Sequence, residues 1–143
     1  MRYKFVQGSK AERHTQPTGE STTFLATGAD TDGRVSIFDS HLSAGNGAPW
    51  HFHEADDEIF YVISGEVEFG IDRETVVAKP GDLVIAGPKV HRRFKALVDS
   101  HLLVVNAPGG PSEGFLRDVM NLDRTPTAAD RARFVEKYGI HVV

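Results

Sequence analysis

Short runs of β-branched and aromatic residues, separated by glycine and other turn residues, fill the middle of the sequence. Four of these runs are TTFLATG (22–28), RVSIFDSHL (34–42), EIFYVISG (58–65) and DLVIA (82–86). Residues 66–71 alternate strictly, with apolar side chains on one face and two glutamates on the other. About eight to ten such strands predict an all-β barrel or sandwich, because a βαβ fold would place helices between them.

The length of the chain fits a single domain. We predict one domain over 1–143, with a barrel core at about 22–106 and a helical extension at about 111–143. The polar segment 8–21 is expected to be a loop or an arm.

One or two short helices are predicted after the last strand. Ser112 can cap the first of them. Thr127 with Asp130 resembles the capping box that begins a second helix, and Gly139 can end that helix.

Composition excludes several classes of function. The net charge is −4, and no cluster of Lys and Arg stands out, so we expect neither nucleic acid nor a membrane as the main partner. There is no cysteine, which excludes thiolate catalysis, disulfides and cysteine-based zinc sites. No segment reads as a signal peptide or as a membrane span, so a cytoplasmic location is expected.

The segment HFHEADDE (51–58) concentrates titratable residues where a strand is predicted. Residues i and i+2 of a strand share a face, so the side chains of His51 and His53 can converge while Phe52 takes the opposite face. EADD must then form a turn if Glu58 is to lie beside the pair. Imidazole suits Zn, Cu, Fe and Ni, and an added carboxylate widens the choice toward Mn and Fe. The alternatives are a chance pair of histidines, a solvated acidic turn, or a buried hydrogen-bond network.

The full spacing resembles the first sequence motif of the cupin superfamily. It runs from Gly45 through five residues to His51, one to His53, four to Glu58 and six to Gly65.

A second cupin motif resembles PGDLVIAGPKVHRRFK (80–95), with Gly81 opening a strand and His91 closing the set. This copy departs from the usual pattern, and the departures affect the loop geometry and the contacts to substrate. They are Ala86 for proline, Pro88 for glycine and Lys95 for asparagine. The ending RFVEKYGIHVV is similar to that of small bacterial single-domain cupins described as quercetin 2,3-dioxygenase-like.

This resemblance implies a double-stranded β-helix, the jelly-roll barrel of cupins, around one divalent metal ion. The ion would be Fe, Mn, Ni or Co, with Zn as a further option, and its ligands would be His51, His53, Glu58 and His91. The implied activity is that of a dioxygenase acting on a small oxygenated aromatic or enolic substrate with O₂, with Glu58 as the general base. The alternatives are a non-redox isomerase, cyclase or lyase that uses the same ion, and a cupin that binds a small molecule without catalysis.

Strand alternation suggests which side chains line the barrel. If Glu58 points inward, Phe60 and Val62 do too, while Ile59, Tyr61 and Ile63 point outward. The outward apolar set is consistent with a homodimer, or with a C-terminal helix packed on it. Further candidates for the substrate pocket are Phe38, Phe69, Leu83 and Ile85, with Trp50 at the mouth. Each of these can also be ordinary barrel core.

The facing of three other polar residues stays open. An unbulged strand puts Arg93 on the side of His91, where it could recognise a carboxylate of the substrate. A slip of one residue would instead turn Phe94 inward. His41 and His101 lie in strands and could reach the cavity or the surface.

Overall fold

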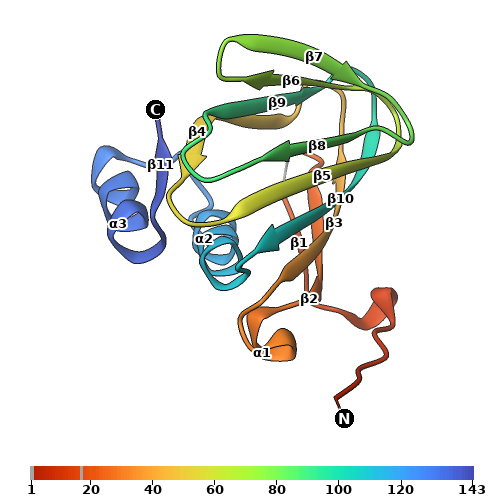
Figure 1. Cartoon of the computed structure of the whole chain (residues 1–143), viewed down its shortest axis with the longest axis vertical. Coiled ribbons are helices and arrows are strands. Elements are labelled where there is room, and N and C mark those ends of the chain that lie inside the picture. Colours follow the sequence, from red (N-terminus) through yellow and green to blue (C-terminus); the bar gives the residue numbers. More distant parts are fainter. Residues whose placement is uncertain (1, 17) are drawn as a thin grey trace.

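The computed structural model describes residues 2–16 and 18–143, and its strands form two antiparallel sheets that face each other (Figure 1). The six-stranded sheet has the order β1-β2-β3-β10-β5-β8, and the five-stranded sheet has the order β11-β4-β9-β6-β7. The strands are β1 Arg13–Thr15, β2 Ser21–Ala26, β3 Ser36–Leu42, β4 Gly47–His53, β5 Asp57–Ser64, β6 Val67–Ile71, β7 Glu74–Ala78, β8 Leu83–Ala86, β9 Arg92–Ala96, β10 Ser100–Ala107 and β11 Ile140–Val142. The helices are the 3₁₀ turn η1 Gly8–Lys10, α1 Gly28–Thr31, α2 Gly110–Asn121 and α3 Ala128–Tyr138.

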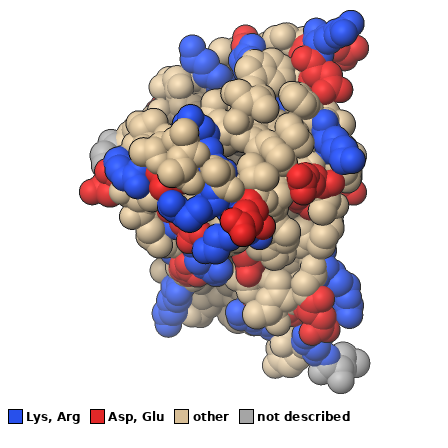
Figure 2. All heavy atoms as spheres, turned by 90° about the vertical axis from the view of Figure 1, so that its left-hand side faces the viewer, with Lys and Arg blue, Asp and Glu red and all other residues tan. Residues whose placement is uncertain are grey.

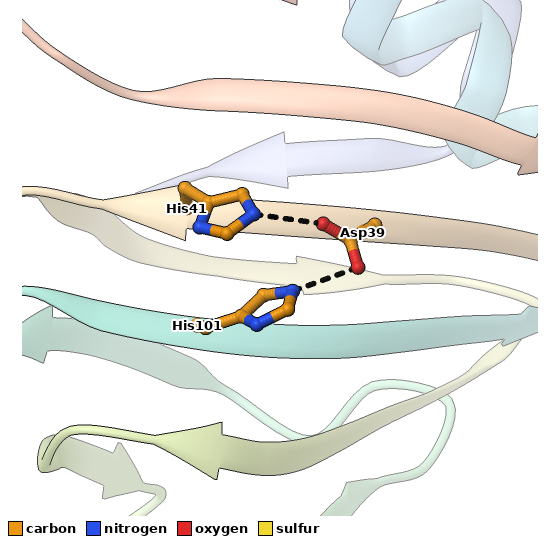
Figure 3. Close-up of side chains that lie close together, drawn as sticks. All are labelled: Asp39, His41 and His101. Carbon is orange, nitrogen blue, oxygen red and sulfur yellow. Dashed lines mark hydrogen bonds and ion pairs between the residues drawn. The ribbon is translucent and has the colours of Figure 1, made fainter. Parts of the chain in front are cut away.

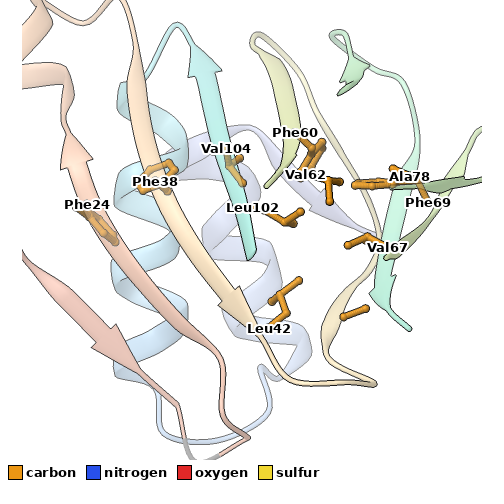
Figure 4. Close-up of a cluster of buried hydrophobic side chains, with 11 residues drawn as sticks. Phe24, Phe38, Leu42, Phe60, Val62, Val67, Phe69, Ala78, Leu102 and Val104 are labelled. Atoms are coloured by element: carbon orange, nitrogen blue, oxygen red, sulfur yellow. The ribbon is translucent and has the colours of Figure 1, made fainter. Parts of the chain in front are cut away.

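The core lies between the two sheets and consists of their inward-facing apolar side chains (Figure 4). Phe60 of β5 meets Phe69 of β6 across the barrel, with ring centroids 5.0 Å apart. Phe94 of β9 packs beside both rings. Burying each side chain of this size contributes about 1.5–3 kcal/mol, so these aromatic contacts hold the two sheets together.

The all-β barrel predicted from the glycine-separated runs is confirmed. Two short strands were not predicted. Arg13–Thr15 forms β1 within the segment expected to be a loop, of which Pro17 lies outside the described residues. Ile140–Val142 forms β11, which pairs with β4. Both are three residues long, too short to show strand alternation in the sequence.

The two longer helices lie at one side of the barrel, next to β11 (Figure 1). The predicted capping box of Thr127 and Asp130 is confirmed at the start of α3, and Gly139 ends the helix with φ 64°. The prediction for Ser112 is wrong. Helix α2 begins at Gly110, and the Ser112 hydroxyl is buried and donates to Asp56.

The surface on the side of α3 and β11 mixes both signs of charge (Figure 2). Lys and Arg side chains there lie among Asp and Glu side chains, so this face carries no extended patch of one sign. None of the helices in the described part of the chain is long and apolar enough to cross a membrane.

Candidate metal centre

Strand β4 presents two imidazoles to the barrel interior. His51 and His53 are buried, and Phe52 between them faces outward, as predicted from the spacing. On one side β4 pairs with β9, and on the other with β11, where Val142 is opposite His51 and Ile140 is opposite His53. The strand that carries the histidines is therefore fixed at both edges.

Each of these imidazoles is oriented through its Nδ1 atom. His51 Nδ1 lies 2.7 Å from the carbonyl oxygen of Pro49. His53 Nδ1 lies 2.9 and 3.0 Å from the two carboxylate oxygens of Asp56. Because a carbonyl or carboxylate oxygen can only accept, both Nδ1 atoms donate, and we assign the lone pair of each neutral ring to Nε2. This arrangement prepares Nε2 of both rings as a metal ligand.

Glu58 lies beside the two histidines, as the expected turn at EADD requires. Its Oε1 atom is 3.8 Å from Nε2 of both His51 and His53, and its side chain is 12% exposed. Burial alone would raise the pKa of Glu58. The imidazoles of His53 and His51, when they carry a proton, and the guanidinium of Arg92 outweigh burial and hold that pKa well below its usual range. Glu58 is therefore ionised, as a ligand must be.

Arg92, not His91, completes the inward face of β9. Arg92 is fully buried, and its Nε donates to Glu58 Oε1 at 3.2 Å. His91 is exposed and stacks on Phe52 on the outer side of the barrel, with ring centroids 4.8 Å apart. The expectation that His91 joins the other three residues is therefore wrong in this structure.

A tight turn precedes β9. Lys89 adopts a positive φ of 66°, and its backbone N–H donates to the carbonyl of His53. The strand then starts at Arg92, with Phe94 packed against the core and Ala96 buried within it. Phe94 faces inward, as in the slipped alternative of the sequence analysis, but no slip occurs, because Arg93 stays on the side of His91 and both point outward. The apolar residues Phe94 and Ala96 were the available signal, because strand alternation puts residue 92 on their side.

A buried polar network supports the site and was missed by sequence reasoning. Asp56, which holds His53, also accepts from Asn106 Nδ2 at 2.9 Å and from the Ser112 hydroxyl at 3.2 Å. Asn106 Nδ2 lies 3.3 Å from Glu58 Oε2 as well. Asp56 belongs to the acidic run that resembles a solvated turn, so the sequence carried no signal for its burial.

Two buried polar atoms of this network have no hydrogen-bond partner among the described residues. They are Nη2 of Arg92 and Oδ1 of Asn106. Leaving such groups unpaired costs about 1–3 kcal/mol each. Both belong to side chains that contact Glu58, so the unused hydrogen-bonding capacity is concentrated at the candidate centre.

Four of the predicted pocket residues are parts of a packed core. Phe38, Phe60, Val62 and Phe69 are almost completely buried and contact other core side chains (Figure 4). The inward facing predicted for Phe60 and Val62 is confirmed. Much of the barrel interior is thus filled by protein, which leaves little room for a large flat substrate.

The other four pocket candidates lie away from the interior. Leu83 and Ile85 point outward and are 52% and 60% exposed, which corrects their assignment to the cavity. Arg93 also points outward, where it pairs with Glu68 at 3.1 Å and lies over the ring of Trp50.

Trp50 contributes to an open groove of ≈850 Å³ at one end of the barrel. The groove is also lined by Ile71, Asp72, Arg73, Glu74 and His91. One of these lining residues, Ile71, is the register partner of the buried Arg92.

The donor set fits a divalent transition metal. His51, His53 and Glu58 each offer one ligand atom, and these atoms all lie within 4.8 Å of one another. Two imidazoles with one carboxylate form the facial triad that holds non-haem iron in many oxygenases, and the same set suits other divalent ions. Three protein ligands leave coordination positions for substrate, which distinguishes a working metal from a structural one.

Comparison with known proteins bears on the fold that carries these residues. Residues 38–107 match the family model described as the cupin domain. No curated protein matches the chain. Among solved structures, KdgF from Halomonas sp. is similar with a TM-score of 0.67 and 21% identity, over 74% of this chain and 94% of that one. An RmlC-like cupin from Shewanella frigidimarina is similar with a TM-score of 0.66 and 19% identity, over 73% and 90%.

A third similar structure is Pac13 from Streptomyces, described as a nucleoside dehydratase. It gives a TM-score of 0.64 and 19% identity, over 79% of this chain and 88% of that one. At these identities the likeness concerns the fold. The two sheets have the jelly-roll arrangement of these structures, and the match to the cupin domain model covers residues 38–107.

Proposed function

We propose that this chain is a metal-dependent dioxygenase of the cupin type that acts on a small enolic or hydroxylated substrate. The observation that carries the proposal is the convergence of His51 Nε2, His53 Nε2 and Glu58 Oε1, with both histidines held through Nδ1. When bound there, a divalent Fe, Mn, Ni or Co ion supplies Lewis acidity toward the substrate oxygen and a site for O₂.

Arg92 and Asn106 are the residues that we expect to orient the substrate. The free Nη2 of Arg92 can donate to a substrate oxygen, and the free Oδ1 of Asn106 can accept from a substrate hydroxyl. A guanidinium in a buried site favours a negatively charged oxygen. Because the aromatic side chains pack with one another, a small acid or enol fits this centre better than a flavonol does.

Glu58 remains the candidate proton acceptor, but its environment limits that role. A carboxylate whose pKa is held far below its usual range is a weak base toward an enol or a phenol. Glu58 therefore suits the task of a ligand, and proton removal is easier for substrates that the bound ion and Arg92 have already made acidic.

A second function is favoured by Arg92. A permanent cation beside Glu58 can stabilise a developing oxyanion without any redox step. This suits a lyase, a cyclase or an isomerase, and Pac13 is described as a dehydratase on a similar fold. In this alternative the ion acts only as a Lewis acid, and zinc would serve.

Metal analysis and oxygen uptake test the proposal. Protein purified without a histidine tag is analysed for bound metals, loaded with Fe, Mn, Ni or Co, and assayed with β-diketones, catechols, flavonols and hydroxy acids. We expect O₂ consumption with at least one small substrate, lost in His51→Ala and kept in His91→Ala. Conversion of a substrate without O₂ uptake would establish the second function. Binding of these compounds without conversion would leave the non-enzymatic alternative.

We further propose that two copies of the chain pair through the outer face of β5 and β8. Tyr61 of β5 lies opposite Leu83 of β8, and Ile59 lies opposite Ile85. Four side chains of this apolar patch are 41–60% exposed, namely Tyr61, Ile63, Leu83 and Ile85. Helices α2 and α3 lie against β11 instead, so they leave the patch open.

Sedimentation measures this pairing directly. We expect a particle of two chains, and a single chain for Ile85→Lys, since a charge in the centre of an apolar contact prevents its burial. Val77→Lys is the matched control, because Val77 is an exposed strand residue of the other sheet. A single chain in the wild type contradicts the proposal.

A further inference from the structure

A second cluster of metal-binding side chains lies on the outer face of the six-stranded sheet, away from the cupin interior. Asp39 and His41 are two residues apart on β3, so they project from the same face. His101 of β10 is the direct cross-strand partner of His41. The sequence left the facing of both histidines open, and the structure places them together, with Asp39 beside both rings (Figure 3).

Both imidazoles direct their Nε2 atom toward the carboxylate of Asp39. Nε2 of His101 lies 2.7 Å from Asp39 Oδ2, and Nε2 of His41 lies 3.2 Å from Asp39 Oδ1. The rings are stacked with centroids 4.0 Å apart and an interplanar angle of 15°. Because a carboxylate oxygen only accepts hydrogen bonds, Nε2 of His101 donates to Asp39 here, and an ion bound at that atom would replace its proton.

The spacing of the ligand atoms is close to what a metal ion needs. One ligand atom from each of the three residues lies within 4.8 Å of the other two. Tetrahedral ligands at about 2.0–2.1 Å from zinc are about 3.3 Å apart. Modest rotations about the side-chain torsions therefore bring all three atoms onto one ion.

Strand geometry makes this cluster more than a pair of surface contacts. Asp39 and His101 have side chains only 24% and 25% exposed, and all three residues are short side chains on paired central strands. Little conformational freedom is lost when such ligands bind an ion. Elsewhere in the described chain, His14 pairs with Glu12 and His141 pairs with Glu54, but each of those contacts offers one imidazole and one carboxylate.

We propose that Asp39, His41 and His101 form a second metal site, for a divalent ion that prefers imidazole, such as Zn, Cu, Ni or Co. The site has three protein ligands, and the exposed side of His41 leaves the remaining positions open to solvent. It is separate from the inner centre, because its side chains point outward from β3 and β10, whereas His51, His53 and Glu58 point inward.

Titration of metal-free protein with Co²⁺ tests the proposal, with binding followed by calorimetry and by the visible absorption of Co²⁺. We expect two ions per chain in the wild type and one in His53→Ala, in which the inner site is disabled. Adding His101→Ala to that variant should remove the remaining ion, whereas adding His141→Ala should leave it bound. Asp39→Asn should weaken the outer site at least tenfold and preserve the shape of the side chain.

Two results would overturn the proposal. One is His53→Ala protein that is folded and binds no Co²⁺. The other is a second ion that survives the loss of His101. Because His53→Ala can disturb the barrel, the wild type offers an independent reading. Co²⁺ should broaden the ring proton resonances of His41 and His101, and unchanged signals at saturating Co²⁺ would also reject the site. Neither measurement depends on the activity of the inner centre.

Discussion

The inner and outer clusters use the same chemistry on opposite faces of one barrel. Each combines two histidines and a carboxylate, and each arises from residues two apart on a strand plus a donor from another strand. They differ in their surroundings. The inner histidines are held by Asp56 and by a backbone carbonyl, and Arg92 pairs with the carboxylate. Within the described residues, the outer histidines pair with Asp39 and stack on each other.

Sequence spacing alone can bring a set of ligands together. Burial then determines which further groups must neutralise the carboxylate and hydrogen-bond to the imidazoles. A buried carboxylate needs a compensating cation, and buried imidazoles need partners for their second nitrogen. In an exposed cluster, water can solvate the carboxylate and hydrogen-bond to the second nitrogen of each imidazole. The inner cluster therefore has a larger network, and changes to that network should have larger effects.

The largest effect should follow from removing the buried guanidinium. Arg92→Met leaves Glu58 buried beside two imidazoles without its permanent cation, and we expect the free energy of unfolding to fall by about 3–5 kcal/mol. Asp39→Asn in the outer cluster should cost at most about 1 kcal/mol. Urea unfolding of metal-free protein measures both.

Arg93→Met is the matched control for that experiment. Arg93 forms a partly exposed pair with Glu68, so its loss should also cost at most about 1 kcal/mol. Equal losses for Arg92→Met and Arg93→Met would show that the buried pair has no special role.

The second largest effect should come from removing the metal, which should affect the stability conferred by the two clusters differently. An ion that binds only the folded state adds about 2.7 kcal/mol at a concentration of one hundred times its dissociation constant. We expect chelation to lower the melting temperature of metal-loaded wild type and of His101→Ala by similar amounts. His53→Ala should respond much less, because the preorganised inner site binds the ion more tightly. If the chelator effect disappeared in His101→Ala instead, the outer site would be the one that binds the ion more tightly.

The partner of His53 should have a smaller, graded effect. Asp56→Asn weakens the acceptor that holds His53 Nδ1, and such changes typically lower metal affinity about 10–100-fold. Calorimetric titration of the inner site measures this change. The outer site should bind with unchanged affinity in Asp56→Asn, which provides an internal control in the same sample.

The smallest effect is the loss of folding stability at low pH. Glu12, which lies outside both clusters, is the reference for it. Its hydrogen bond to Arg117 lowers the pKa of Glu12 from 4.5 to about 2. A lowered pKa means that this pair stabilises the fold above about pH 4.5, and that the contribution is lost as the pH falls through about 2. Since the pair is partly exposed, Glu12→Gln should cost well under about 1 kcal/mol. Protons compete with a metal ion for imidazole nitrogens, so stabilisation by metal should fall at higher pH than that of Glu12.

Unfolding curves of the metal-loaded protein over this pH range test the order. Glu136→Gln, at an exposed position of α3, controls for the loss of one charge. A metal effect that persists down to about pH 4.5 would argue against histidine ligands in either cluster.

The parts that sequence could predict depend on local patterns. Glycine-separated apolar runs sufficed for the all-β barrel, and the i, i+2 rule sufficed for the facing of His51 and His53. The facing of His91 was missed because Arg92, Phe94 and Ala96 take the inward face of β9, and the positive φ of Lys89 in the preceding turn has no clear signal in the sequence. Leu83 and Ile85 were misplaced because their facing depends on pairing with β5, which is not a local property. Asp56 and Asn106 meet only in the folded chain.

The pairing of β11 with β4 links the order of synthesis to the assembly of the centre. During translation, residues 51–53 leave the ribosome long before residues 140–142. One edge of β4 therefore stays unpaired until β11 has been synthesised. Until then its backbone amides and carbonyls beside the histidines remain open to water or to another chain. The growing polypeptide can therefore collapse early around its aromatic side chains, whereas the strand that carries the two histidines is paired at both edges only after residues 140–142 have been synthesised.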